Sequence, residues 1–287
     1  MTVLDKKIDF SVVLTATKSN PNGDPLNGNR PRQNYDGHGE ISDVAIKRKI
    51  RNRLQDMGES IFVQSNDRTT DSFTSLKERA ESNETLAKII KSKQSQNDLF
   101  AEMACKEWLD VRAFGQVFAY KGSTAGSGVS VGVRGPVSIH TATSVDPVDI
   151  TSVQITKSVN SEPGKERGSD TMGMKHRVEF GVYVLHGSIN VQLAEKTGFT
   201  KEDADKIKQA LVTLFENDAS SARPEGSMEV HKVYWHQHDS KMGDYSSAKV
   251  HRSLRVECKT DSSKSIEDYS ISFDKIDGLH TDEIDGK

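Results

Sequence analysis

The stretch of sequence that decides the fold is residues 8–57, IDFSVVLTATKSNPNGDPLNGNRPRQNYDGHGEISDVAIKRKIRNRLQDM. It begins with an almost unbroken apolar run, Ile8 to Ala16, which predicts a strand in the middle of a sheet rather than at its edge. Residues 18–32 follow and are rich in Pro, Gly and Asn, which favour turns over regular structure. A long loop of this kind inside a compact domain is usually functional or disordered.

A cationic helix follows the loop. Ser42 suits its N-cap, Asp43 suits the positive end of the helix dipole, and Gly58 is a typical residue at a helix end. The apolar stripe that we expect to be buried consists of Ile46, Ile50, Leu54 and Met57. Strand, basic loop and basic helix in succession predict a surface that suits a polyanion.

The cations of this helix allow two interpretations. Helical spacing puts Lys47, Arg48 and Arg51 opposite the apolar stripe, and Lys49 and Arg53 at its border. Asp43 and Asp56 are the acids of the helix, so carboxylate partners at helical spacing are scarce. The helix is therefore either a polyanion-binding face, which Arg30 and Arg32 of the loop would extend, or a solvated face, which is the usual role of a charge run.

Composition sets broad limits. A chain of 287 residues is long enough for one large or two modest domains with real cores. The net charge of -3 does not by itself suggest a nucleic-acid binder, but acidic and basic residues are segregated along the chain. Two distant cysteines, Cys105 and Cys258, suggest a reducing compartment without a disulfide framework. Without a signal-peptide pattern or a membrane-spanning apolar run, we expect a cytoplasmic protein and no membrane partner.

The rest of the chain predicts a central domain with two insertions. Its parts are residues 1–60 of the central domain, an inserted polar lobe at 61–110, more of the central domain at 111–150, a protruding β-hairpin at 151–178, the last central part at 179–259, and an acidic, mobile tail at 260–287. A second amphipathic helix is expected from Thr200 to Phe215. Without the insertions the order reads βαββαβ, which predicts an α+β fold with a ferredoxin-like or RNA-recognition-motif-like core. Many unrelated functions use that core.

The sequence offers little catalytic or metal-binding chemistry. His231, His236, His238 and His251 could gather, but they lack cysteines or carboxylates at a recognisable spacing, so packing or surface roles are favoured and no metal is predicted. The glycine loop at 121–128 lacks the lysine pattern of a P-loop and is interpreted as a connector. Neither cysteine has the local signature of a nucleophile. We expect no cofactor.

A nuclease is the alternative function. Asp24, Asp36 and His38 lie in the basic loop region, where an acid beside bound RNA could assist cleavage. The simpler interpretation is that Asp24 caps a turn in Asn22-Gly23-Asp24-Pro25. The absence of a compact acid–base constellation favours a protein that does not catalyse a reaction.

Several segments together resemble one family. They are residues 20–25 (NPNGDP), 28–32 (GNRPR), 42–51 (SDVAIKRKIR), 110–115 (DVRAFG), 133–137 (VRGPV) and 172–176 (MGMKH). They are similar to the Cas-seven backbone subunit of type I-C CRISPR surveillance (Cascade) complexes, of the Csd subtype and RAMP superfamily. The resemblance covers roughly residues 8–195, and the acidic tail lies outside it.

The resemblance implies a hand-shaped protein. A ferredoxin-like palm carries an inserted helical finger lobe and a β-hairpin thumb, and copies stack head-to-tail along the guide RNA (crRNA). The guide bases pair with a target DNA strand, other Cascade subunits complete the complex, and cleavage is assigned elsewhere. A binder of variable guides must rest on phosphates and shape, while pairing reads sequence. Non-closing head-to-tail contacts generate an open helix.

The resemblance also implies RNA-binding residues. They are Asn20, Asn22, Arg30, Arg32, Lys47, Arg48, Arg51, Arg112, Gln116, Arg134, Arg167, Met172, Lys175, His176 and Arg177. The alternative is an RNA-processing endoribonuclease of the same superfamily, because some members of the wider superfamily cut RNA.

Overall fold

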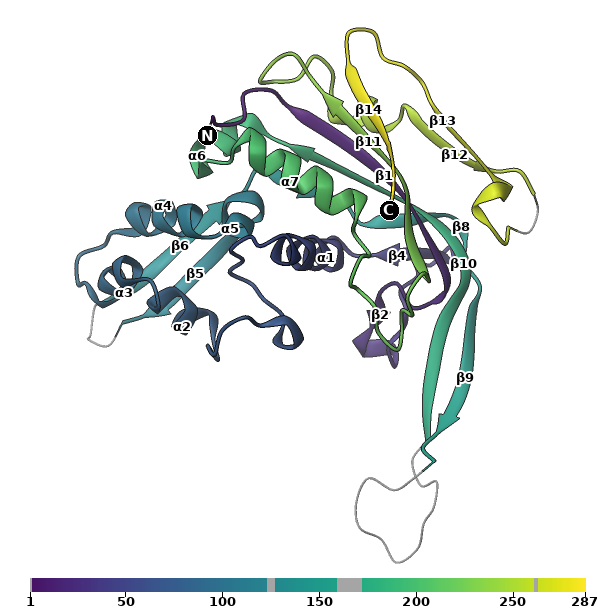
Figure 1. Ribbon diagram of the computed structural model, residues 1–287, viewed down its shortest axis with the longest axis horizontal. Coiled ribbons are helices and arrows are strands. Elements are labelled where there is room, and N and C mark those ends of the chain that lie inside the picture. The colour runs from purple at the N-terminus through teal and green to yellow at the C-terminus, as the bar shows by residue number, and fades with distance from the viewer. Residues whose placement is uncertain (1, 123–126, 159–171, 261–262) are drawn as a thin grey trace, which may run out of the picture.

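A central antiparallel sheet organises the protein. The computed structural model describes residues 2–122, 127–158, 172–260 and 263–287 (Figure 1). The strand order is β14-β11-β1-β10-β8-β4, and β7 and β9 also pair with β10. The strands are β1 (Ile8–Ser19), β4 (His38–Ile41), β7 (Val137–Ile139), β8 (Ala142–Pro147), β9 (Ile150–Thr156), β10 (Met172–Ile189), β11 (Met228–Gln237) and β14 (His280–Asp285). Two small strands, β2 (Gly23–Asp24) and β3 (Arg30–Pro31), pair with each other in the basic loop.

Strand β1 lies between β10 and β11, so its predicted central position is confirmed. Its residues from Ile8 to Ala16 are all buried, because both faces of the sheet are covered. Leu14 contributes to the main core on the helix side, while Val13 belongs to a smaller core on the other side. A strand with two covered faces has no need of the alternation that marks a half-buried strand.

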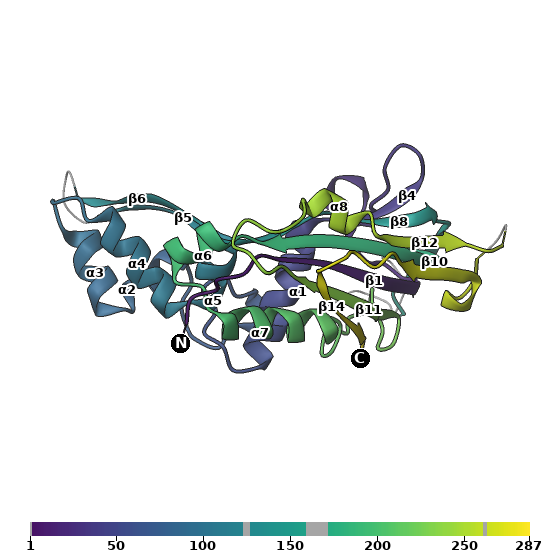
Figure 2. The ribbon, with the colours of Figure 1, turned by 90° about the horizontal axis from the view of Figure 1, so that it is seen from above.

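Helices α1 (Asp43–Asp56), α6 (Val191–Thr197) and α7 (Lys201–Val212) contribute to the main core on one side of the sheet (Figures 1 and 2). In α1, Ile46, Ile50 and Leu54 are fully enclosed as predicted, whereas Met57, at the C-cap, is partly buried. Ser42 caps this helix by accepting from the N–H of Ala45 (3.4 Å). Helix α7 begins with a capping box in which Thr200 and Asp203 bond each other's backbone N–H.

The opposite side of the sheet is covered by β12 (Leu254–Cys258) and β13 (Tyr269–Phe273), with α8 (Ser247–His251) and the short 3-10 turn η3 (Ile266–Asp268) nearby (Figure 2). Tyr269 packs there with Val13, Val182 and Tyr234. This small core explains why β1 is apolar on both sides.

The prediction of a mobile tail from residue 260 is wrong for the strands found there. Strand β13 pairs with β12, and β14 pairs with β11 from Lys232 to Gln237. The acids of β14 are matched by cations far away in sequence: Lys232 Nζ lies 2.7 Å from Glu283, and Lys208 Nζ lies 3.0 Å from Asp282. The acidic residues of β14 thus belong to an ion-paired edge strand and not to a solvated tail. Counting charges along the sequence does not distinguish the two, because the cationic partners are distant.

A second lobe has its own core. It contains α2 (Leu76–Glu81), α3 (Glu84–Lys91), α4 (Asn97–Glu107), α5 (Leu109–Phe114), β5 (Gly115–Lys121), β6 (Gly128–Arg134) and the 3-10 turn η2 (Asn66–Arg68). The rings of Phe62, Trp108, Phe100 and Phe118 pack in its centre. Because Phe118 and Val129 share this core, the lobe extends past the predicted boundary at residue 110 to include β5 and β6.

The β9–β10 hairpin, here called the arm, projects from the sheet (Figure 1). Residues 150–156 pair with Met172–Val178. The segment between them includes Arg167, which lies outside the described residues. Among the residues that the structure does describe, no helix has the length and apolarity needed to cross a membrane.

Candidate nucleic-acid interface

The loop at residues 20–32 is closed by its own side chains. Asn20 is buried, and its Nδ2 donates to the carbonyl of Asn29 (2.7 Å). Asn22 Oδ1 accepts from the backbone N–H of Ser42 (2.9 Å), which ties the loop to the start of α1. Two residues expected from sequence to touch RNA therefore already have structural bonds, and they fix where the loop sits.

Asp24 caps the short 3-10 turn η1 (Pro25–Asn27) by accepting from the N–H of Leu26 (3.3 Å). The same oxygen lies 3.3 Å from Arg32 Nη2. The turn-cap interpretation of Asp24 is confirmed. His38 bonds the carbonyl of Ser144 through Nδ1 (2.9 Å).

The arginine before Pro31 reaches the arm. Arg30 Nη1 donates to Ser152 Oγ (2.8 Å), and Ser152 Oγ also bonds His176 Nδ1 (2.8 Å). Arg177 Nε, at the same root of the arm, contacts Glu179 (3.0 Å). The basic loop and the arm root therefore form one continuous surface.

The cations of α1 predicted to face a polyanion have partners within the protein. Lys47 Nζ lies 3.0 Å from Asp43, and Arg48 Nη1 donates to the carbonyl of Val63 (2.9 Å). Burial lowers the pKa of Arg48 from its ordinary value. The face is neither a row of free cations nor a simple solvated face, because its side chains connect α1 to neighbouring segments.

Arg51 makes a further connection of this kind. Its Nε donates to Asp110 Oδ2 (2.9 Å), and its guanidinium lies 5.0 Å from the centre of the Phe114 ring. Asp110 is buried and also accepts from the N–H groups of Phe62 (2.7 Å) and Val63 (3.1 Å). Arg51 thus joins the sheet domain to the second lobe.

Lys49, which the helical spacing put at the border of the stripe, is 5% exposed and pairs with Asp218. Asp218 also accepts from Arg223 Nε (3.1 Å). Burial lowers the pKa of Lys49 to about 8, although the carboxylate of Asp218 acts in the opposite direction. The loop at residues 217–223, which sequence reasoning missed, is therefore attached to α1 by a buried cation.

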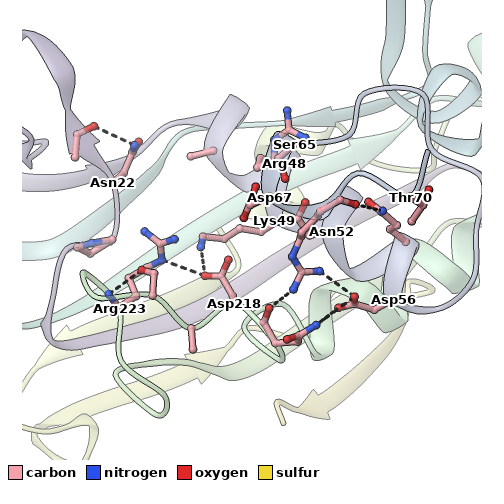
Figure 3. Close-up of a pocket in the computed structure, with 18 residues that line it drawn as sticks. Asn22, Arg48, Lys49, Asn52, Asp56, Ser65, Asp67, Thr70, Asp218 and Arg223 are labelled. Carbon is pink, nitrogen blue, oxygen red and sulfur yellow. Dashed lines mark hydrogen bonds and ion pairs between the residues drawn. The ribbon is translucent and has the colours of Figure 1, made fainter. Parts of the chain in front are cut away.

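A cavity of about 760 Å³ opens between these parts (Figure 3). Residues 21–23, α1, residues 65–70 and the 217–223 loop line it. Asp56 at its rim holds Arg53 (3.0 Å), Arg68 (2.9 Å) and Asn217 (3.3 Å) together. The buried Oδ1 of Asn52 has no hydrogen-bond partner among the described residues, so the cavity wall offers an unused acceptor.

A second cavity of about 260 Å³ lies between the same loops and the arm. Gly28, Met174, His176 and Ala222 are among its lining residues. The N–H of Asn20 donates to the carbonyl of Ala222 (2.9 Å), so the 217–223 loop contributes to both cavities. The 20–32 loop, α1, the 217–223 loop and the arm root therefore form one polar surface that contains two open cavities. A surface of this shape can accept a flexible polymer.

Three side chains on the arm are exposed to solvent. Met172 is 71% exposed, and Met174 and Lys175 are also exposed. Exposed methionines on a projecting hairpin differ from the gap-filling role that is usual for this residue.

The remaining predicted contacts lie in or near the second lobe. Arg112 makes a bidentate pair with Asp203 of α7 (2.8 and 2.9 Å), so it joins the lobe to the sheet domain. Burial opposes the charge of Arg112, but the bond to Asp203 raises its pKa overall. Gln116 on β5 bonds the carbonyl of Val117, and Arg134 at the end of β6 is exposed. The structure does not bring these residues into the two cavities.

The histidines have structural partners. His238 Nε2 bonds the buried Asp9 (2.8 Å), His236 Nδ1 bonds Thr281 (2.9 Å), and His251 Nε2 bonds the carbonyl of Gly187 (3.0 Å). In the part of the chain that the structure describes, no group of three or more His, Cys, Asp or Glu side chains is placed to hold a metal ion.

Comparison with known proteins identifies the family. The family model of CRISPR-associated protein Cas7 matches residues 6–274. This chain belongs to the Cas7 family. A Cas7 protein of Haloferax volcanii is 25% identical to it over 309 residues, covering 98% of this chain and 87% of that protein.

Solved structures similar to this Cas7-family chain include a chain described as "CRISPR RNA-guided surveillance complex". It has a TM-score of 0.46 and 18% identity, and the match covers 80% of this chain and 68% of that one. A second, described as "CRISPR RNA-guided surveillance complex, pre-nicking", has a TM-score of 0.45 and 16% identity, covering 80% and 78%.

Proposed function

We propose that this protein is a non-catalytic backbone subunit that binds guide RNA in a type I-C CRISPR interference complex. The observation that carries the proposal is the continuous surface of the 20–32 loop, α1, the 217–223 loop and the arm root in a chain of the Cas7 family. Copies would stack head-to-tail along the RNA with other subunits and leave its bases free to pair with target DNA.

In this proposal the parts of the fold take the roles of a hand. The order β11-β1-β10-β8, with α1 and α7 on one side, supports a ferredoxin-like palm, because a βαββαβ chain gives this neighbour order. The lobe with its own core would be the finger, and the arm would be the thumb.

The chemistry of the surface supports binding without sequence preference. Arg48, Lys49 and Arg223 line the larger cavity, and the exposed Lys175 lines the smaller one, so phosphates would meet cations at both. The carboxylate of Asp218 already holds Lys49 and Arg223 in place. An incoming phosphate would compete with the carboxylates, and we therefore expect moderate affinity per copy and strong dependence on salt.

The candidate catalytic residues Asp24 and His38 already have structural bonds, which supports a role without catalysis. Asp24 is used as a turn cap and ion-pair partner, and the ring of His38 bonds the carbonyl of Ser144. We propose no cleavage step for either residue.

The first test is the size and nucleic-acid content of the purified protein, by light scattering with absorbance at 260 and 280 nm. A large, RNA-containing assembly that dissociates in high salt is the expected result. Arg223→Ala should then weaken binding of unrelated RNA sequences equally, whereas the control Lys106→Ala, on an exposed ion pair with Glu102 in the second lobe, should not. A monomer that ignores added guide RNA at low salt would refute the proposal.

A further inference from the structure

Tyr35 stands out among the exposed apolar side chains. It lies at the tip of a tight turn and is 97% exposed. Tyrosine rings bury a large area when they are covered, and they are enriched where proteins bind other molecules. A ring that touches almost nothing in the free protein is therefore available to a ligand.

The turn beneath the ring is firmly held from within. Asn34 Oδ1 accepts from the backbone N–H groups of Asp36 (3.0 Å) and His38 (2.9 Å), and the N–H of Asn34 donates to the carbonyl of His38 (2.9 Å). Gly37 takes a φ of +86°, which only glycine adopts without strain, and closes the turn.

The turn is also attached to the root of the arm. Gln33 Nε2 donates to the carbonyls of Gly37 (3.0 Å) and Val148 (2.8 Å), and the N–H of Val148 donates back to Gly37 (3.0 Å). Val148 lies just before β9. The ring is thus presented on a braced support at the base of the arm, so binding would cost little ordering of the backbone.

Charged residues lie close to the turn in the sequence. Arg30 and Arg32 precede it within the same segment, and Arg30 contacts Ser152 of the arm. Asp36 follows the ring directly, and its carboxylate would repel a phosphate. The backbone of a nucleic acid would therefore lie toward the arginines, and the ring would meet a base.

The surroundings of the ring also distinguish a base from a protein partner. Within residues 20–41, all of which the structure describes, Leu26 is equally exposed (97%), but Tyr35 is the one exposed aromatic ring. A stable protein interface has a wider buried core than one ring can supply. A single flat ring suits the face of a nucleobase, which stacks on aromatic side chains whatever its identity.

We propose that Tyr35 is a stacking platform for a nucleobase, either of the guide or of the strand paired with it, and this inference rests on the proposed RNA-binding function. Stacking adds affinity without adding a charge. It would therefore complement the arginines, whose contribution weakens with salt.

The test is titration of labelled single-stranded RNA into wild-type protein and into Tyr35 variants at several salt concentrations. Tyr35→Ala and Tyr35→Leu should weaken binding roughly five- to a hundredfold, as loss of one stacked base does, with the salt slope unchanged. Tyr35→Phe keeps the ring and should bind like the wild type. Wild-type affinity in Tyr35→Ala, or a salt slope lowered by about one, would overturn the assignment.

Tyr35→Trp supplies an independent readout, because the two native tryptophans, Trp108 and Trp235, are buried. Quenching of its fluorescence by RNA alone assigns the base to the guide, and quenching only after complementary DNA is added assigns it to the paired strand. No quenching at saturation would refute stacking, as would a change of assembly size in RNA-free Tyr35→Ala, which indicates a contact between copies. If the wild type binds no RNA, the proposed function itself fails, and this inference with it.

Discussion

Helix α1 and the arm both carry cations in the sequence, but the structure uses them in opposite ways. In α1, Lys49 and Arg51 contact acids from distant segments. On the arm, Met172, Met174 and Lys175 are open to solvent. A cluster of cations in a sequence can therefore have two roles. In α1 the cations form ion pairs within the protein, and on the arm the side chains are free to contact another molecule.

The largest effect should come from breaking the α1 network at Asp110. Asp110→Ala removes the acceptor of Arg51, Phe62 and Val63 and leaves one buried and two partly buried donors without it. We expect the free energy of unfolding to fall by about 3–5 kcal/mol, measured by urea denaturation. Asp43→Ala is the control, because its partner Lys47 is partly exposed, and it should cost less than about 1 kcal/mol. Equal losses would mean that the network does not brace the domain.

Lower pH should destabilise the sheet domain that carries α1. Burial, followed by the neighbouring histidines, lowers the pKa of His186 to about 3, and burial lowers that of His236 to about 4. Both lie below the unfolded value of about 6.5, so the unfolded chain binds more protons between these limits. Stability should be complete above pH 6.5 and fall as pH decreases toward 4, by up to about 1.4 kcal/mol per pH unit for each histidine.

The measurement for this prediction is the urea midpoint between pH 7 and pH 4.5. His186→Gln should flatten the dependence, while replacing the exposed His280 by Gln should leave it as it is. If His186→Gln keeps the full slope, His186 is not the source of the acid sensitivity.

On the arm, Lys175→Ala should reduce RNA affinity several-fold and lower the salt slope by about one, because one phosphate contact is lost. The melting temperature should not change, since Lys175 is exposed. Fluorescence anisotropy at several salt concentrations measures the slope. Lys88→Ala, an exposed lysine of α3, is the control. A lower melting temperature of Lys175→Ala would show that Lys175, like the cations of α1, stabilises the fold.

The smallest effect should come from Met172→Ala. Its side chain is 71% exposed, so the free energy of unfolding should change by less than about 0.5 kcal/mol. Leu54→Ala, in the buried stripe of α1, should instead cost about 2–5 kcal/mol. Calorimetry of the two variants compares them directly. A loss of several kcal/mol in Met172→Ala would show that the arm is packed against the body.

Features that depend on the local sequence pattern were predicted correctly. The unbroken apolar run of β1 predicted a central strand, and the spacing of Ile46, Ile50 and Leu54 predicted the buried face of α1. Helical phase is harder to assign within the lobe: Leu99 of α4 is apolar but 43% exposed, whereas its neighbour Phe100 is buried. A one-residue error in helical phase is enough to reverse that assignment.

Long-range pairing was beyond the reach of the sequence. The partners of Lys49 and Arg112, Asp218 and Asp203, lie 169 and 91 residues away. No local sequence pattern predicts such pairs. Arg112 was therefore wrongly expected to be available to RNA, and the 217–223 loop was not recognised as part of the candidate site. The same reason explains the edge strand β14, whose cationic partners also lie far back in the chain.

The two borders of the main sheet restrict how copies of the protein can join. On one border β14 is lined by charged side chains, with Asp282 paired to Lys208 and both Glu283 and Asp285 paired to Lys232, and charged residues on an edge strand disfavour pairing with another chain. On the other border the N–H of Glu40 in β4 already donates to the carbonyl of Arg32 (2.9 Å). Strand-to-strand addition is therefore disfavoured at both ends, and an ordered assembly would have to use side chains on the lobes and loops, where geometry can limit growth to one direction.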